Sequence, residues 1–466
     1  MALHLGDLRR MRRRAPLGAR GARAGGCRAA GDEARRPLHG GAAAARSARS
    51  LAPRRCRGRR AAPRPLLATP VTARTLFVPG RIELFGKHVD YGGGPSLTCA
   101  VALGITATIE PIDRPILEVV DEVTHRRTRA PLRRDARAVA AHGGTYVAAV
   151  ARRMARDFAP LRRGVRVTTR SDLPRSSGLS SSSALVVLLT IAVAEANRLR
   201  ERRVWRDYLF SPLALAEYAA AIEMGGTWGP FPGDDGVGTR GGAQDHIAIC
   251  CNLAEQVGMY AYLPAAALGR APFPASWSLL VAVSGVRATK TAGAMGDYNR
   301  AADELRGLVA TWNASTGRHD LSLRAALASG PDAVARLTEV TRGAGDPAGR
   351  LARLAQFRAE TERLVPAALD AFGTADARRL GALAVESQQL AEVVLRNQVP
   401  ETMHLTRAAM DAGAHAASAF GAGFGGAVWA VVDATEADAV TARWRASYLR
   451  AFPARESQAR WVTVRP

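Results

Sequence analysis

The sequence predicts a two-domain protein that mixes strands with helices and is preceded by an Arg-rich tail. Its 466 residues exceed what one hydrophobic core usually supports. From residue 71 onward, short β-branched runs typical of strands are interspersed with apolar residues at helical spacing. A linker of small residues and prolines lies at 265–275. We therefore expect domains at 71–270 and 271–466.

Residues 1–70 form the Arg-rich tail. Its first 65 residues hold 18 Arg against three acidic residues, and so contribute most of the formal net charge of +24. Without a sustained apolar period they cannot bury enough surface to offset the entropy of ordering, so we expect disorder. There are two alternatives to a disordered tail. Its composition resembles that of an organelle transit peptide, or these residues are not part of the functional protein. We expect nucleic-acid binding, if any, through this tail alone.

The spacing of the cysteines and the length of the apolar runs indicate in which cellular compartment the protein works. The longest strongly apolar run, 184–194, is too short to cross a bilayer, so we expect no membrane partner. The cysteines show no metal-ligand spacing, and two of them are adjacent and therefore poor disulfide partners. A reducing, cytoplasmic location fits these five residues best: Cys27, Cys56, Cys99, Cys250 and Cys251.

The first predicted domain alternates strands with helices. Residues 75–78 read as a strand that Pro79 and Gly80 end with a turn. Further strands are predicted at 104–109, 115–120 and 164–169, and helices at 146–158, 182–198 and 213–224. Residues 225–242 form a long loop rich in Gly, Pro and Asp, which makes them a candidate binding or lid segment.

The second predicted domain is mostly helical between two strands. The strands are predicted at 276–283 and 427–432, and amphipathic helices at 297–314, 350–371, 376–394 and 400–412.

A serine-rich segment precedes the apolar helix near residue 182. Small side chains there allow the backbone to approach phosphate oxygens, and a helix N-terminus favours an anion. A serine-rich helix cap is the alternative. The P-loop string Gly-x-x-x-x-Gly-Lys-Ser/Thr is absent, so any phosphate site belongs to another class. The candidate ATP-binding residues are Ser176, Ser177, Gly178, Leu179, Ser180, Ser181, Ser182 and Ser183.

A second polar segment concentrates charges ahead of a glycine cluster. Its side chains suit a polyol site, because each sugar hydroxyl needs both a donor and an acceptor. They are Arg81, Glu83, Lys87, His88 and Asp90. After the long loop, Asp245 precedes an apolar run, where a carboxylate is a candidate general base or electrostatic anchor.

Taken together and in order, these segments and the glycine-rich turn 418–426 resemble the three motifs of the GHMP kinase superfamily. The resemblance covers roughly 71–435 and is greatest to the galactokinase branch, through Gly80-Arg81, His88-Val-Asp90-Tyr91 and Gly242-Ala-Gln-Asp245. It implies an α+β fold in two domains, with an N-terminal α/β domain, a C-terminal ferredoxin-like domain and the active site between them. It also implies ATP and Mg²⁺.

The resemblance assigns roles to individual residues. Asp245 corresponds to the catalytic carboxylate and Arg81 to the arginine beside it, while Ser182 and Glu223 correspond to Mg²⁺ ligands. The residues that correspond to sugar contacts are His88, Asp90 and Tyr298. Those of the third motif, near the phosphates, are Gly421, Gly423, Gly425 and Gly426.

Two positions depart from the galactokinase pattern. Glu83 stands where that family usually has Asn, and Lys87 where it usually has Glu. Either the two side chains pair with each other, leaving a neutral sugar as substrate, or Lys87 meets an anionic group of an acidic sugar. We expect the pair, because the two exchanges preserve the local charge.

The expected function is that of a galactokinase-like enzyme, which transfers the γ-phosphate of ATP to a sugar hydroxyl, with the anomeric O1 expected. A kinase for an acidic or other non-galactose sugar is one alternative. A sensor that binds ATP and sugar without turnover is the other.

Overall fold

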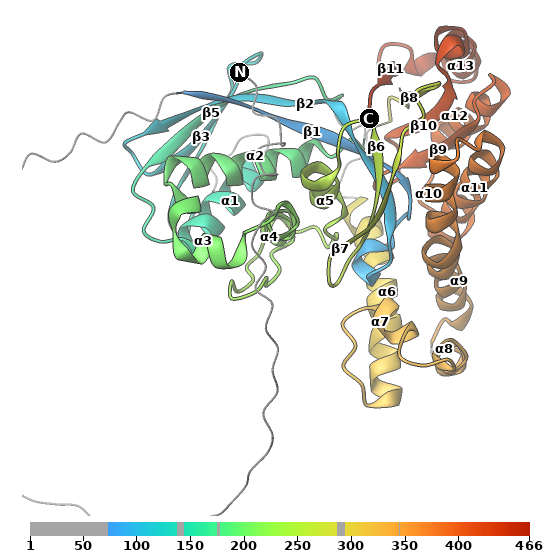
Figure 1. The fold of residues 1–466 in the computed structure, drawn as a ribbon, viewed down its shortest axis with the longest axis horizontal. Helices are drawn as coiled ribbons and strands as arrows, with labels where there is room; N and C mark the ends of the chain where they lie inside the picture. Colours follow the sequence, from blue (N-terminus) through green and yellow to red (C-terminus); the bar gives the residue numbers. More distant parts are fainter. Residues whose placement is uncertain (1–72, 138–143, 175–177, 287–293, 344) are drawn as a thin grey trace, which may run out of the picture. The chain divides into compact units, whose positions relative to one another are not determined.

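The computed structural model describes residues 73–137, 144–174, 178–286, 294–343 and 345–466 (Figure 1). The Arg-rich tail, for which the sequence predicts disorder, lies outside the described residues. Residues 71–466 form one compact unit.

A seven-stranded sheet forms the first half of this unit. Its strand order is β4-β3-β5-β2-β6-β7, with β1 paired to β2. All pairs are antiparallel except β3 with β5. The strands are β1 (Arg74–Phe85), β2 (Ser96–Ile112), β3 (Ile116–Asp121), β4 (Arg127–Pro131), β5 (Gly164–Ser171), β6 (Gln256–Ala261) and β7 (Ala266–Pro272).

A four-stranded antiparallel sheet forms the second half, in the order β11-β8-β10-β9. Its strands are β8 (Trp277–Val283), β9 (Ala416–Phe420), β10 (Ala427–Asp433) and β11 (Arg460–Val464). The chain passes from the first sheet to the second between Pro272 and Trp277, close to the domain boundary predicted near residue 270.

Five helices belong to the first half and eight to the second among the described residues. The first five are α1 (Gly144–Asp157), α2 (Ser181–Ala196), α3 (Arg203–Tyr208), α4 (Pro212–Met224) and α5 (Gln244–Cys251). The others are α6 (Ala294–Thr316), α7 (Leu323–Leu327), α8 (Ala333–Arg342), α9 (Pro347–Arg358), α10 (Val365–Gly373), α11 (Ala377–Leu390), α12 (Pro400–Asp411) and α13 (Ala437–Ala451). None of these described helices combines the length and apolar character that a membrane crossing requires.

Helix α2 is the centre of the first half. It packs on β1, β2 and β5 and also contacts α1, α4 and α5 (Figure 1). A helix with neighbours on all sides must be apolar all round, which explains why residues 184–194 lack an amphipathic pattern. The packing places the N-terminus of α2, and with it the serine-rich segment, next to the start of α5 and the middle of β1.

The predicted elements are largely confirmed, with two differences. The predicted turn at Pro79 and Gly80 is wrong, because β1 continues to Phe85 and pairs with β2 through a register shift at that point. Pairing with a long neighbouring strand therefore overrides the local turn chemistry. As a result Arg81 and Glu83 lie on a strand and not in a loop. The predicted helix 350–371 is likewise interrupted by a π-helical turn at Ala359–Leu364.

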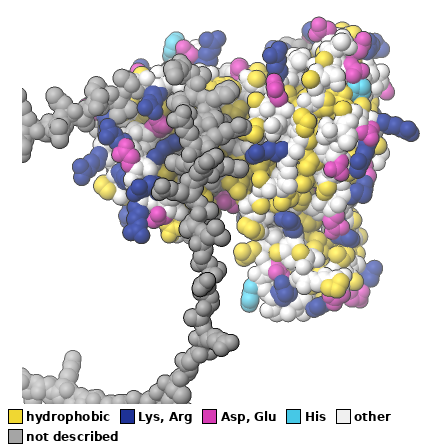
Figure 2. Space-filling model, viewed as in Figure 1, with side chains coloured by type: hydrophobic (Ala, Val, Ile, Leu, Met, Phe, Trp, Pro, Cys, Tyr) yellow, Lys and Arg dark blue, Asp and Glu magenta, His cyan; other side chains and the backbone are white. Residues whose placement is uncertain are grey.

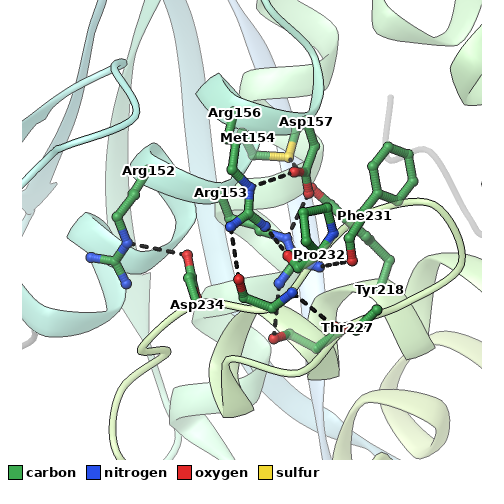
Figure 3. Close-up of polar contacts among 12 residues, drawn as sticks. Arg152, Arg153, Met154, Arg156, Asp157, Tyr218, Thr227, Phe231, Pro232 and Asp234 are labelled. Carbon is green, nitrogen blue, oxygen red and sulfur yellow. Dashed lines mark hydrogen bonds and ion pairs between the residues drawn. The ribbon is translucent and has the colours of Figure 1, made fainter.

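Arginines of α1 hold the long loop after α4 (Figure 3). Arg153 is buried against Asp157, with Nε 2.6 Å from Oδ2, and donates to the carbonyls of Gly226 at 2.9 Å and Phe231 at 3.1 Å. Arg152 pairs with Asp234 at 3.1 Å in the same way. The first part of the loop is thus fixed to the domain.

Acidic and basic side chains lie side by side over the described residues on the face shown in Figure 2.

Candidate active site

A cavity lies where the predicted functional segments meet. Strand β1, the turn after it, the starts of α2 and α5, the end of α4 and the third glycine-rich turn all contribute side chains to its wall. The lining residues are Arg81, Glu83, His88, Asp90, Tyr91, Ser183, Glu223, Met224, Thr239, Gly241, Gly242, Gln244, Asp245, His246, Gly421 and Ala422.

Arg81 and Asp245 form the centre of the cavity. The Arg81 guanidinium donates from Nε and Nη2 to Asp245 Oδ1 at 2.9 and 2.5 Å. It also donates from Nη1 to the carbonyl of Gly178 at 2.5 Å. Asp245 lies in the first turn of α5, where the helix dipole favours a carboxylate. The structure therefore unites the first motif, the serine-rich segment and the predicted catalytic carboxylate.

The serine-rich segment is bound to this centre. Ser180 has a left-handed backbone, with φ of 59°, and its hydroxyl donates to Asp245 Oδ2 at 2.6 Å. Ser180 is the residue before α2, yet its side chain makes no capping hydrogen bond to that helix. A helix cap therefore does not account for this serine. Ser176 and Ser177 lie outside the described residues.

The third motif approaches the serine-rich segment. Gly421, Gly423, Gly425 and Gly426 all have φ between 80° and 121°, a region that L side chains rarely adopt. A Cβ on Gly421 would lie 3.2 Å from Cα of Gly178, so the two backbones are close neighbours. The predicted glycine-rich elements thus meet at one end of the cavity.

Glu223 lies beside Ser183 on the cavity wall. The Ser183 hydroxyl donates to Glu223 Oε2 at 3.0 Å and lies 3.5 Å from Asp245 Oδ2. His246 Nε2 is 3.0 Å from the same Glu223 oxygen. Ser182, the serine predicted to bind metal, is half-buried in the same helical turn and does not line the cavity. Carboxylate and hydroxyl oxygens at this place fit the ligand preference of Mg²⁺.

His88 is held between two segments far apart in the sequence. Its Nδ1 lies 2.8 Å from the Tyr91 hydroxyl, and its Nε2 lies 3.3 Å from the carbonyl of Ala422 and 3.0 Å from Asn397 Nδ2. The residue has φ of 56°. From α9, Arg353 donates to its backbone carbonyl at 2.5 Å. These contacts fix the ring at the edge of the cavity.

Asp90 is buried next to the start of α5. It accepts from the backbone N–H of Gln244 at 3.4 Å. Burial, together with the nearby charge of Asp245, raises the pKa of Asp90 to about 6. A side chain at Gly242 would overlap the Asp90 carboxylate, which explains why glycine is required there.

Lys87 does not line the cavity. Its side chain is buried and donates to the hydroxyls of Ser387 at 2.8 Å and Ser418 at 2.7 Å. Ser387 in turn donates to Glu360 at 2.6 Å. Burial lowers the pKa of Lys87, and the charge of Glu360 opposes this more strongly than that of Glu83. The main carboxylate near Lys87 is thus Glu360 and not Glu83.

Glu83 does line the cavity. Its side chain is buried, and burial raises its pKa to about 8 against the opposing charges of Arg81 and Lys87. The two residues that depart from the galactokinase pattern therefore lie in different surroundings. Tyr298 belongs to α6, but its side chain lies outside the described part of the chain.

Sequence reasoning missed several residues that shape the site. Asn397 bridges His88 and the third motif, Glu360 faces Lys87, and Gln244 lines the cavity next to Asp245. Asn397 and Glu360 follow the first motif by about 300 residues and carry no local signal. Gln244 stands beside the predicted carboxylate and could have been found there.

Three family models match the chain. The galactokinase galactose-binding signature matches residues 69–111, the GHMP kinases N terminal domain matches 145–234, and the GHMP kinases C terminal domain matches 368–450.

Curated relatives of the chain are galactokinases. The galactokinase of Lacticaseibacillus casei is 29% identical over 206 residues, which is 41% of this chain and 46% of that protein. The match thus spans about half the length of this relative. The galactokinase of Chloroflexus aggregans is 27% identical over 383 residues, which is 80% of this chain and 88% of that protein.

Solved structures share the fold. Galactokinase of Lactococcus lactis, complexed with galactose, has a TM-score of 0.66 at 18% identity and covers 85% of this chain and 94% of its own. Mevalonate kinase of Methanococcus jannaschii has a TM-score of 0.52 at 13% identity, covering 85% of this chain and 98% of its own. The expected mixed α+β fold with N- and C-terminal domains is confirmed.

Proposed function

Because the chain belongs to the galactokinase branch of the GHMP kinase superfamily, we propose that it is an ATP-dependent sugar kinase. It transfers the γ-phosphate of ATP to a sugar hydroxyl, the anomeric O1. The observation that carries the proposal is the arrangement of Arg81, Asp245 and Ser180 at the point where the cavity meets both glycine-rich segments.

Phosphoryl transfer mainly requires that the reacting groups be positioned and that the negative charge of the transition state be stabilised. Asp245 accepts hydrogen bonds from Arg81 and Ser180, so its carboxylate is fixed in place. In the proposed reaction it accepts a hydrogen bond from the attacking hydroxyl and orients it. Arg81 then stabilises negative charge that develops during transfer.

The family uses ATP, and two segments of this chain suit its phosphates. These are the serine-rich segment 176–183 and the turn that contains Gly421, Gly423, Gly425 and Gly426. Bound Mg²⁺ would neutralise phosphate charge, with Glu223 and the hydroxyls of Ser182 or Ser183 as its ligands. The described cysteines, Cys99, Cys250 and Cys251, are free thiols, which favours a reducing compartment such as the cytoplasm.

The sugar is proposed to bind against His88, Asp90 and Glu83, with Tyr298 as a further contact. Lys87 is held by Ser387 and Ser418 away from the cavity, so its ammonium cannot neutralise a substrate carboxylate or phosphate. This supports a neutral sugar, with galactose as the first candidate, over an acidic one.

A coupled ADP-release assay tests the proposal. Galactose, arabinose, mannose, galacturonate, glucuronate, a heptose 7-phosphate and mevalonate serve as acceptors, with Asp245→Asn as the control variant. We expect turnover with a neutral sugar and a loss of at least about 100-fold in Asp245→Asn. Sugar binding without ADP release in the wild type would make the protein a sensor. Preference for galacturonate would contradict the neutral-sugar assignment.

A further inference from the structure

Two polar groups in the cavity wall have no partner within the described residues. Glu83 and Gln244 are 3% and 5% exposed, and both line the cavity. Glu83 Oε1 and Gln244 Nε2 make no hydrogen bond to any described group. The two side chains are close enough for the Gln244 amide to lower the pKa of Glu83, but their contact lacks hydrogen-bond geometry. A buried polar group without a hydrogen bond destabilises the fold, so the pair is best explained by a ligand that satisfies both.

The two groups lie directly beside the catalytic pair. Glu83 follows Arg81 by two positions in β1, and alternate residues of a strand share one face. Gln244 precedes Asp245 at the start of α5, and its backbone N–H is used by Asp90. A sugar whose hydroxyl meets Asp245 therefore brings another part of the same ring to Glu83 and Gln244.

The chemistry of the pair selects the group that it can bind. Because burial raises its pKa to about 8, the Glu83 carboxyl group can both donate and accept a hydrogen bond, whereas Gln244 Nε2 is a donor. A sugar hydroxyl has one donor and two acceptor lone pairs, so it satisfies both at once. An ammonium has no acceptor for Gln244.

We propose that Glu83 and Gln244 together form a specificity subsite that reads a second, non-reacting hydroxyl of the sugar ring. This inference rests on the proposed function and deepens it. The substrate is a neutral sugar in which that hydroxyl is obligatory. A site built around a hydroxyl rejects an analogue without it far more strongly than an apolar pocket rejects one methylene, because its own polar groups would stay unpaired.

Monodeoxy sugars test the subsite together with protein variants. The 2-, 3-, 4- and 6-deoxy forms of the best neutral substrate are compared with the parent sugar. Dissociation constants are measured by calorimetry with a non-hydrolysable ATP analogue, and kcat/KM by ADP release. The variants are Gln244→Leu and Glu83→Leu, and thermal unfolding confirms that each is folded. Thr239→Val is the matched control, since it changes another buried polar residue of the same cavity wall.

The expected result is an energetic coupling between one hydroxyl of the sugar ring and the two side chains of the subsite. In the wild type, removing one particular hydroxyl weakens binding by about 30-fold or more, and in either Leu variant the same removal has less than about a threefold effect. Thr239→Val leaves the wild-type penalty at that position in place. Equal losses for all five sugars in both Leu variants would overturn the proposal, and so would the absence of binding to any sugar of the panel.

The outcomes separate this inference from the proposed function. If the coupling is found in the calorimetry but no ADP is released, the subsite stands and the kinase proposal fails. If ADP is released and no deoxy sugar shows the coupling, the kinase proposal stands and the subsite is refuted.

Discussion

Replacing Lys87 by Met would test whether this lysine is a buried structural charge. Its side chain is 2% exposed and donates to Ser387 and Ser418. Glu360 is held in the same cluster by Ser387 at 2.6 Å and by the backbone N–H of Gly86 at 3.0 Å. The variant leaves Glu360 buried without its opposing charge. Removing the ammonium also deletes two buried hydrogen bonds from a charged donor, each worth about 1.5–3 kcal/mol, so we expect the free energy of unfolding to fall by about 3 kcal/mol or more at pH 7.

Urea unfolding followed by tryptophan fluorescence measures the change. The double variant Lys87→Met/Glu360→Gln should recover part of the loss, because no unopposed charge then remains buried, while the hydrogen bonds of Lys87 stay lost. Arg133→Met is the matched control: Arg133 pairs with Asp135 at 3.0 Å, but both side chains are largely exposed. Its effect should stay below about 1 kcal/mol.

Two results would refute this reasoning. The first is a loss below about 1 kcal/mol in Lys87→Met, which would mean that the ammonium does not stabilise the buried cluster. The second is a stable Lys87→Glu variant that loses the use of an acidic sugar. That result would place Lys87 at the substrate.

Three further predictions concern the loop, the pH dependence and the sugar site. Arg153→Met should raise the rate of amide hydrogen exchange in the loop after α4, because Arg153 holds that loop through the carbonyls of Gly226 and Phe231. Exchange as slow as in the wild type would contradict this role of Arg153. The raised pKa of Glu83, about 8, means that the folded protein binds more protons than the unfolded chain between about pH 5 and pH 8. The free energy of unfolding of the wild type should therefore fall relative to that of Glu83→Gln as the pH rises through this window, by up to about 1.4 kcal/mol per pH unit. Parallel curves of unfolding free energy against pH for the two proteins would exclude a raised pKa of Glu83. Gly242→Ala should raise the KM for sugar by about 10-fold or more without changing the KM for ATP, because its Cβ would displace Asp90, whereas Gly226→Ala, which has open space around it, should change neither. Equal effects of the two Ala variants would contradict that explanation.

Much of the fold could be predicted because its signals are local. The unbroken apolar run of α2 and the β-branched strands follow directly from side-chain pattern. The path of β1 could not be predicted in this way. Pro79 and Gly80 are turn residues by local chemistry, but pairing with β2 carries the strand past them to Phe85.

The catalytic pair of the site could be predicted from the sequence, whereas the surroundings of Lys87 could not. Arg81 and Asp245 were found because their segments resemble known motifs, and the structure brings them into contact. The surroundings of Lys87 could not be foreseen, since Ser387 and Ser418 follow it by 300 and 331 residues. The preserved local charge suggested Glu83 as its partner, but the charge balance of one segment does not show what the rest of the chain places beside it.

The most direct test of the proposed reaction follows the transferred phosphate. Galactose, ATP and Mg²⁺ are incubated with the wild type and with Asp245→Asn, and ³¹P NMR records the product. We predict a sugar phosphate resonance coupled to the anomeric proton for the wild type. The rate should be lower by at least about 100-fold for the correctly folded variant, because Asp245 orients the attacking hydroxyl. Near-normal product formation by Asp245→Asn would contradict the role assigned to this carboxylate. A phosphate coupled to any other sugar proton would contradict transfer to O1.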